Sequence, residues 1–117
     1  MEPVPSRKFP VIFYQTPAGG HEVRDWLKSL DETERAAIGQ DLMRVQFRWP
    51  VGMPLCRPLG NGLWEVRSNL PANKIARVIF CIIEGRILAL HGFIKKTRKT
   101  PGDDLNLARQ RKQEFDR

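Results

Sequence analysis

The 117-residue chain contains few cysteines, few histidines and no long apolar run. Its two cysteines, Cys56 and Cys81, and its two histidines, His21 and His91, are not spaced as zinc ligands are. No stretch approaches the ~20 apolar residues of a membrane span, and residues 1–9 lack the apolar core of a signal peptide. We therefore expect a cytoplasmic protein that does not enter the membrane and keeps both cysteines reduced in its core.

Signatures of several large enzyme classes are also missing. The chain has no P-loop, no dinucleotide-binding glycine pattern and no recognisable Ser/His/Asp spacing, so we expect neither a small-molecule cofactor nor a metal. A ribonuclease with paired histidines is available only if His21 and His91 meet in space. Any other RNA cleavage is expected to rely on lysine and arginine, which neutralise the charge of a phosphorane-like transition state.

Positive charge is abundant and unevenly distributed. The net charge is +7, which makes nucleic acid a plausible partner class. Residues 1–43 hold five Lys/Arg and seven Asp/Glu, whereas residues 44–117 hold fifteen and six. The positive excess therefore lies in the second part of the chain. The length suits one domain, residues 1–117, in which we expect residues 1–8 to be a flexible N-terminus.

The first part of the chain predicts a strand and a two-helix hairpin. Residues 9–15 form the strand, and Pro10 favours a sheet edge or the strand start. Asp31 and Glu34 match a capping box that begins the second helix, and Pro50 ends it. The first helix is predicted by apolar residues at i, i+3, i+4 and i+7, namely Val23, Trp26, Leu27 and Leu30.

The second part predicts a sheet and a last helix. Residues 51–62 are interpreted as a loop, with a short extended piece at Leu55. Strands at 63–68, 75–83 and 86–95 have short connections, so an antiparallel meander is expected. Thr100 and Pro101 begin the last helix. The order β-α-α-β-β-β-α indicates an α+β domain with its helices packed on one face of the sheet.

Alternation along the strands predicts a basic face. Glu65 and Arg67 point away from Trp64, and Arg77 is the only charge within its strand. If the helices cover the apolar side, Glu65, Arg67 and Arg77 line an open surface suited to a nucleic-acid backbone. A Glu65–Arg67 salt bridge across strands and a merely solvated Arg77 remain alternatives. The three tryptophans fit core positions better than base-stacking ones.

A dense cationic segment follows the last strand. It begins after His91 and contains Lys95, Lys96, Arg98 and Lys99. Such a cluster against a sheet suits phosphate binding, although a charge run is equally often a solvated face. Lys95 and Lys96, crowded by other cations, are candidates for proton transfer. His91 is more often a hydrogen-bonded structural residue than a catalyst, and both interpretations stay open.

Four segments together carry a resemblance: LWEVRS (63–68), ARVIFC (76–81), LALHGFIKKTRKTP (88–101) and DLNLARQRKQEF (104–115). With them the chain resembles the RelE/ParE toxin superfamily, most closely its HigB-like, phage-derived branch of bacterial type II toxin–antitoxin modules. The resemblance covers roughly residues 9–115 and implies a RelE-like fold. It also implies a metal-independent endoribonuclease that cuts mRNA in the ribosomal A site. The implied partners are the ribosome, mRNA and a cognate antitoxin with a helix-turn-helix DNA-binding domain.

The resemblance also implies residue roles. Arg67 and Arg77 hold phosphates, and Lys95 and Lys96 supply transition-state charge or proton transfer. Glu65 and His91 are weaker candidates for orientation or acid–base work. Residues implied to bind RNA are Arg98, Lys99, Arg109, Arg111 and Lys112, although the last three also fit the solvated side of a helix.

Two departures from the family leave the general base open. Some RelE-type members use a C-terminal tyrosine, where this chain has Phe115 and Arg117, and the His-Asp-Tyr cluster of other HigB toxins is missing. Two other functions fit the same chain. One is a ParE-like inhibitor of DNA gyrase, and the other is a non-catalytic basic nucleic-acid-binding phage protein.

Overall fold

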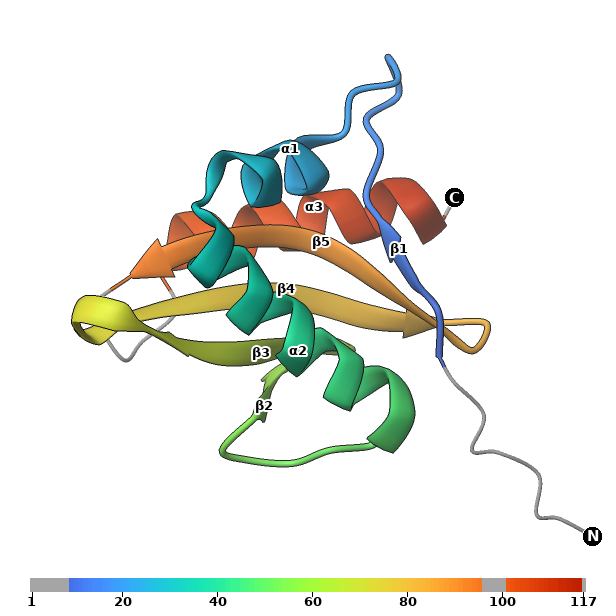
Figure 1. The fold of residues 1–117 in the computed structure, drawn as a ribbon. Coiled ribbons are helices and arrows are strands. Elements are labelled where there is room, and N and C mark those ends of the chain that lie inside the picture. The colour runs from blue at the N-terminus through green and yellow to red at the C-terminus, as the bar shows by residue number, and fades with distance from the viewer. Residues whose placement is uncertain (1–8, 96–100, 117) are drawn as a thin grey trace, which may run out of the picture.

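The computed structural model describes residues 9–95 and 101–116 as an α+β fold (Figure 1). The predicted fold class and its RelE-like arrangement are confirmed, whereas the expected flexible segment 1–8 lies outside the described residues. In chain order the elements are β1 (Val11–Phe13), α1 (Glu22–Ser29), α2 (Glu32–Arg48), β2 (Cys56–Gly60), β3 (Leu63–Leu70), a short 3-10 turn (Pro71–Asn73), β4 (Lys74–Ile83), β5 (Arg86–Lys95) and α3 (Gly102–Asp116).

The five strands form one mixed sheet in the order β1-β5-β4-β3-β2. The predicted antiparallel meander β3-β4-β5 is confirmed, and β1 lies at an edge, parallel to β5. The interpretation of residues 51–62 as loop is wrong for β2, which pairs antiparallel with β3. Because Pro58 lacks an N–H donor, this short strand fits only an edge, and its proline and glycine conceal it in the sequence.

Local signals set the helix and turn boundaries as predicted. The Asp31 carboxylate accepts a hydrogen bond from the Glu34 backbone N–H at 2.8 Å, and the Glu34 side chain accepts from the Asp31 N–H. This capping box satisfies two N–H groups that the first turn of α2 leaves without helical partners. Glu84 and Gly85 both have positive φ, 51° and 75°, as a tight β4–β5 hairpin requires.

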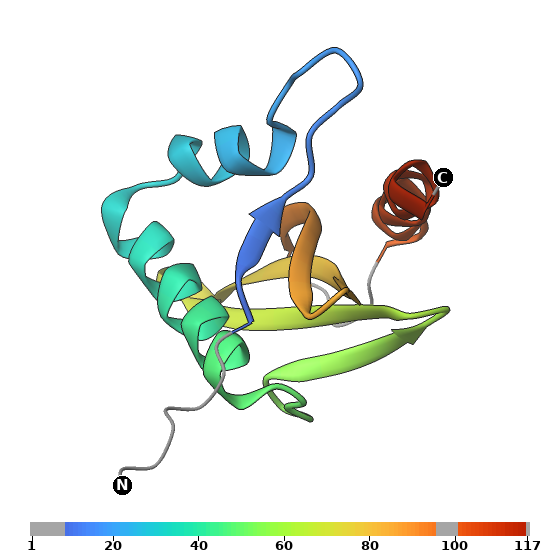
Figure 2. The same cartoon turned by 90° about the vertical axis from the view of Figure 1, so that its right-hand side faces the viewer.

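Helices cover both faces of the sheet, contrary to the prediction that they share one face. Helices α1 and α2 pack on the face we call the hairpin face, and α3 packs on the opposite face, called the α3 face (Figures 1 and 2). The reason lies in β4 and β5, which carry apolar side chains on both sides. On the α3 face, Ile79, Leu88 and Leu90 pack with Ala108 of α3.

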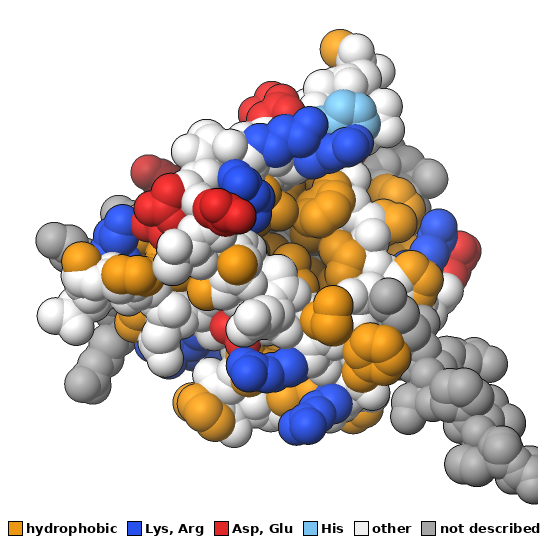
Figure 3. Space-filling view, viewed as in Figure 1, with side chains coloured by type: hydrophobic (Ala, Val, Ile, Leu, Met, Phe, Trp, Pro, Cys, Tyr) orange, Lys and Arg blue, Asp and Glu red, His pale blue; other side chains and the backbone are white. Residues whose placement is uncertain are grey.

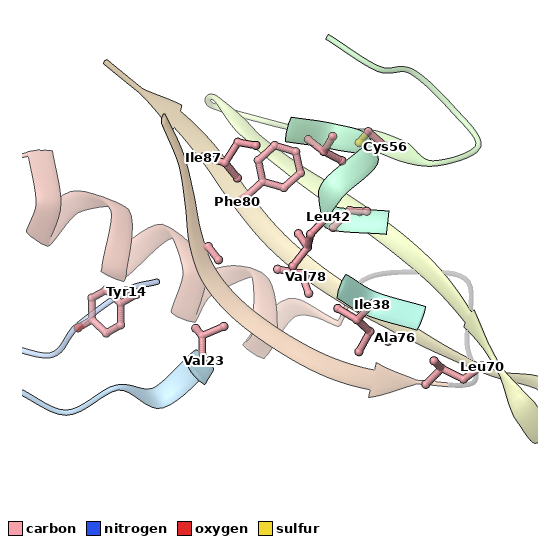
Figure 4. Packing of buried hydrophobic residues seen from close by; sticks show 13 residues of the cluster. Tyr14, Val23, Ile38, Leu42, Cys56, Leu70, Ala76, Val78, Phe80 and Ile87 are labelled. Carbon is pink, nitrogen blue, oxygen red and sulfur yellow. The ribbon is translucent and has the colours of Figure 1, made fainter. Parts of the chain in front are cut away.

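The larger core lies under the hairpin face. Val23 of α1 and Ile38 and Leu42 of α2 belong to the same buried cluster as Val78 and Phe80 of β4 (Figure 4). The three tryptophans pack against this core as predicted, and Cys56 and Cys81 are buried and free. None of the described helices is long and apolar enough to span a bilayer.

A β-bulge decides which face the end of β5 presents. The register pairs Phe80 with Ala89 but Ile79 with His91, so Leu90 is an extra residue on β5. Strict alternation from Ala89, which faces the hairpin core, would have turned His91 to the same side. The bulge instead turns His91 and the residues after it by one position, since an extra residue reverses the inward and outward pattern. His91 and Phe93 therefore lie on the α3 face, opposite Ile79 and Arg77.

Candidate functional site

His91 and Asp104 form a pair where β5 meets the first turn of α3. The Nε2 atom of His91 lies 2.6 Å from Oδ1 of Asp104. The His91 side chain keeps 16% of its surface exposed, and its ring stacks on Phe93 at 5.4 Å between ring centroids. A carboxylate accepts hydrogen bonds, so in a neutral ring Nε2–H donates to Asp104 and Nδ1 carries the lone pair. The pair therefore has the composition of an oriented general base.

Glu65 and Arg77 lie side by side on the same face, completely buried. The Arg77 Nε atom is 3.8 Å from Oε2 of Glu65, and neither residue has exposed surface. The prediction that both line an open surface is wrong, because α3 and the edge strand β2 turn that surface into packed interior. The proposed alternative of a Glu65–Arg67 bridge is likewise replaced by the contact with Arg77.

Two further arginines surround this buried pair. Arg57 is opposite Glu65 on β2, and Arg67 is opposite Arg77 across β3 and β4. Both side chains are half-buried. Burial lowers the pKa of Arg77 below its ordinary value, Arg67 and Arg57 lower it further, and Glu65 raises it. Three guanidinium groups around one carboxylate leave an excess of positive charge, so this end of the α3 face is electropositive.

The register places the histidine pair and the arginines in adjoining rows. Residues Arg57, Glu65, Ile79 and His91 face one another along one row across β2 to β5, and Arg67, Arg77 and Phe93 make the next row. Neighbouring rows on one sheet face lie within reach of long side chains. Lys95 ends β5 and pairs with Ile75 in a third row. We call this set of rows the candidate site.

The cationic segment itself lies outside the described residues. This applies to Lys96, Arg98 and Lys99, and to the side chain of Lys95. Their roles in catalysis and RNA binding therefore stay predictions.

The basic residues of α3 behave differently from one another. Arg111 donates from Nη1 to the Leu90 carbonyl at 2.8 Å, and its guanidinium carbon lies 4.7 Å from the centroid of the Tyr14 ring. Arg111 thus connects α3 to β5 and to Tyr14, which directly follows β1, and its contact with RNA stays a prediction. Arg109 is half-buried, with Nη1 3.5 Å from the Asn106 side chain. Lys112 lies beside Gly62 in the turn between β2 and β3.

Two cavities of the described structure border the candidate site. A cavity of about 510 Å³ opens at the β3 edge between α2 and the loop before β2, bordered by Arg67 but not by His91 or Asp104. A second one of about 240 Å³ lies between α1 and α3 and includes His91 in its wall. No group of three or more His, Cys, Asp or Glu suitable for a metal ion exists among the described residues. His21 is the N-cap residue of α1.

Sequence reasoning missed Asp104 and Arg57. In the sequence, Asp104 is only an acidic residue in the first turn of the predicted last helix, where acidic residues are common because they stabilise the helix. Arg57 stood in a segment interpreted as loop, so no face was assigned to it. Recognising Asp104 required the crossing of α3 over β5, and recognising Arg57 required the pairing of β2 with β3.

Comparison with known proteins agrees with this architecture. No curated protein matches the chain. The family model described as "Phage derived protein Gp49-like (DUF891)" matches residues 25–113, which include the second part of α1, all of α2, four of the strands and most of α3. The chain therefore belongs to the Gp49-like family of phage-derived proteins, within the RelE/ParE-like toxin group of toxin–antitoxin systems.

Proposed function

We propose that this protein is the toxin of a HigB-like toxin–antitoxin module and a metal-independent endoribonuclease that cuts mRNA on the ribosome. Membership of the family supports the toxin role. The observation that carries the chemistry is the 2.6 Å contact between His91 and Asp104, next to a row of arginines. A cognate antitoxin with a helix-turn-helix domain and an acidic segment would neutralise it in the bacterial cytoplasm.

The His91–Asp104 pair suits the first proton transfer of RNA cleavage. The ribose 2′-OH loses its proton to Nδ1 of His91 while its oxygen attacks the adjacent phosphorus. The P–O5′ bond breaks, and the products are a 2′,3′-cyclic phosphate and a 5′-OH. Asp104 holds the ring in the tautomer that accepts this proton and stabilises the imidazolium that forms. Lys95 or Lys96 supplies the proton for the 5′ oxygen.

Positive charge at the candidate site would stabilise the transition state at the scissile phosphate of the RNA. The attack places extra negative charge on the non-bridging oxygens, which fixed cations stabilise. Arg67 and Arg57 are half-buried at this end of the sheet and can contact the backbone directly. Arg77 is buried completely, so it acts from beneath the surface through its field and by holding Glu65 in place.

Induced expression in a bacterium tests the proposal. Wild type, His91→Ala and Lys95→Ala/Lys96→Ala are compared, with Asp103→Asn as the matched control, because Asp103 is an exposed acid next to Asp104. Growth and the 5′ ends of an abundant message are followed by primer extension. We expect arrest with new in-frame 5′ ends for wild type and the control, and neither for the other two variants.

Three outcomes would contradict the proposal. Arrest with intact messages would indicate a gyrase inhibitor of the ParE type. Growth without arrest would indicate a non-catalytic binding protein. Cleavage that persists in folded His91→Ala would remove the assigned base. Circular dichroism of each purified variant shows whether a loss of activity reflects chemistry or unfolding.

A further inference from the structure

Helix α2 carries an apolar ridge on the side that faces away from the sheet. Its inward residues Ile38, Leu42 and Val45 are buried in the core. Met43 and Phe47, one turn apart on the outward side, keep 53% and 47% of their surface exposed. Among the described residues only four large hydrophobic side chains are exposed, and two of these four are neighbours on α2. Clustered exposed apolar side chains mark interaction sites more often than isolated ones do.

The ridge borders a shallow groove with a basic wall. The groove has a volume of about 310 Å³ and is lined by Gln40, Met43, Arg44, Phe47 and Arg48. Arg44 and Arg48 are both exposed and stand one turn apart, parallel to the apolar pair. In the space-filling view, hydrophobic and basic side chains lie next to one another over the lower part of the molecule, where α2 runs (Figure 3).

We infer that this groove docks an acidic amphipathic helix of a partner protein. Anchors at i and i+4 are how one helix receives the apolar face of another. Arg44 and Arg48 select a partner with carboxylates beside its apolar stripe, because complementary charge sets partner choice and register. Arg44 is paired with Asp41 of the same helix at 2.5 Å, so Arg48 carries the larger share of this selection.

Charge argues against the other occupants. Two copies joined by a two-fold axis would bring the same Arg44 and Arg48 toward each other, and each chain has a net charge of +7. RNA would use the arginines, but only Phe47 of the two apolar side chains has a ring on which a base can stack. A lipid surface favours a wider apolar face than two residues.

The docking groove and the candidate site lie on opposite sides of the sheet. Helix α2 covers the hairpin face, whereas Asp104 belongs to α3 on the other face (Figure 2). A partner bound at α2 therefore leaves the His91 side accessible. It would tether the protein without covering the candidate site, and its binding is independent of any RNA cleavage.

A binding experiment with a defined probe tests the inference. The probe is a stapled, fluorescein-labelled helical peptide with Leu at i and i+4 and Glu at i+1 and i+5, and a scrambled peptide of the same composition is its control. Fluorescence anisotropy gives the affinity, and amide chemical shifts of ¹⁵N-labelled protein give the location. Because the patch is small, we expect a dissociation constant in the micromolar range, with shifts confined to α2.

Variants separate the apolar and basic parts of the groove. We expect Met43→Ser/Phe47→Ser to weaken binding roughly tenfold or more. Arg48→Glu should weaken it as well and reduce its dependence on salt. Phe115→Ser and Arg24→Glu, at exposed positions on α3 and α1, are the matched controls and should bind as wild type does.

Several results would overturn the inference. One is equal affinity for the scrambled peptide, and another is a set of shifts on the α3 face. Unchanged binding by folded Met43→Ser/Phe47→Ser would do the same. So would a wild-type dimer in light scattering that these substitutions dissociate, since the second copy would then be the occupant. Displacement of the peptide from α2 by anionic vesicles or by an oligoribonucleotide would assign the groove to lipid or RNA.

Discussion

Asp104 of α3 meets His91 of β5 through a 2.6 Å contact between Oδ1 and Nε2. The two residues come together because a bulge at Leu90 turns the end of β5 and because α3 crosses the same face. A carboxylate at this position fixes both the direction of the ring and its tautomer. Histidines are more often structural than catalytic, but this contact with Asp104 makes His91 a candidate general base.

Asp104→Asn should slow RNA cleavage without unfolding the protein. An asparagine can donate to Nε2 through its amide, which stabilises the wrong tautomer and leaves no lone pair at Nδ1. On ribosomes programmed with a defined message, we expect the single-turnover rate of mRNA cleavage by the variant to be roughly 10²–10⁴-fold lower than by wild type. Asp103→Asn is the control. A rate that stays within a few-fold of wild type would show that Asp104 only caps α3.

Arg77→Met should destabilise the fold strongly. The substitution removes the guanidinium that lies 3.8 Å from the buried Glu65 carboxylate and so takes positive charge away from it. Breaking one side of a buried ion pair costs about 3–5 kcal/mol, whereas replacing both sides by apolar groups costs much less. Urea denaturation should therefore place Glu65→Leu/Arg77→Met closer to wild type than Arg77→Met alone. The opposite ranking would mean that Arg57 and Arg67 hold Glu65 adequately without Arg77.

Gly92 should not tolerate a side chain. A Cβ built at this position overlaps the six-membered ring of Trp26, which lies directly on the β5 backbone. We expect Gly92→Ala to lower the free energy of unfolding by about 1–3 kcal/mol. In a double-mutant cycle with Trp26→Leu, which makes room at the contact, part of this loss should disappear. Additive losses would show that α1 shifts as a unit to relieve the overlap.

Cys56 should remain an unreactive thiol to high pH. Burial, followed by the nearby Asp41 carboxylate, raises its pKa from 9.0 to about 11. Because the folded state holds this proton more tightly, its stabilising contribution is complete below pH 9 and is lost as pH rises toward 11. Between pH 9 and 10.5, urea denaturation should show a steeper loss of stability for wild type than for Cys56→Ala. Rapid labelling of the native Cys56 thiol by a disulfide reagent at pH 8 would contradict its burial and its raised pKa.

Binding to RNA or ribosomes should weaken steeply with salt. Each Lys or Arg that contacts a phosphate releases counterions, so the logarithm of affinity falls linearly with the logarithm of salt concentration. Arg67→Gln should reduce that slope by about one contact relative to wild type, while Arg24→Gln on α1 should not. The readout is filter binding over a salt series. An affinity independent of salt would count against recognition of the RNA backbone.

Much of the fold could be predicted because its signals are local. The capping pattern at Asp31, the stop at Pro50 and the Glu84–Gly85 turn each act through a few neighbouring residues, and all three are present as expected. The apolar alternation of β3 and β4 likewise assigns their faces correctly. The strand β2 was missed because Pro58 and Gly60 read as loop, and only pairing with β3 stabilises it.

The sequence by itself determined the excess of positive charge and the order of all elements except β2, and it indicated the candidate-site residues other than Asp104 and Arg57. Only the tertiary structure decided that α3 covers the second sheet face, that Glu65 and Arg77 are buried, and that His91 meets Asp104. The physical reason is that these outcomes depend on which surfaces pack together. Alternation tells which residues share a face, but a face is open or covered according to elements far along the chain, and a one-residue bulge reverses the pattern.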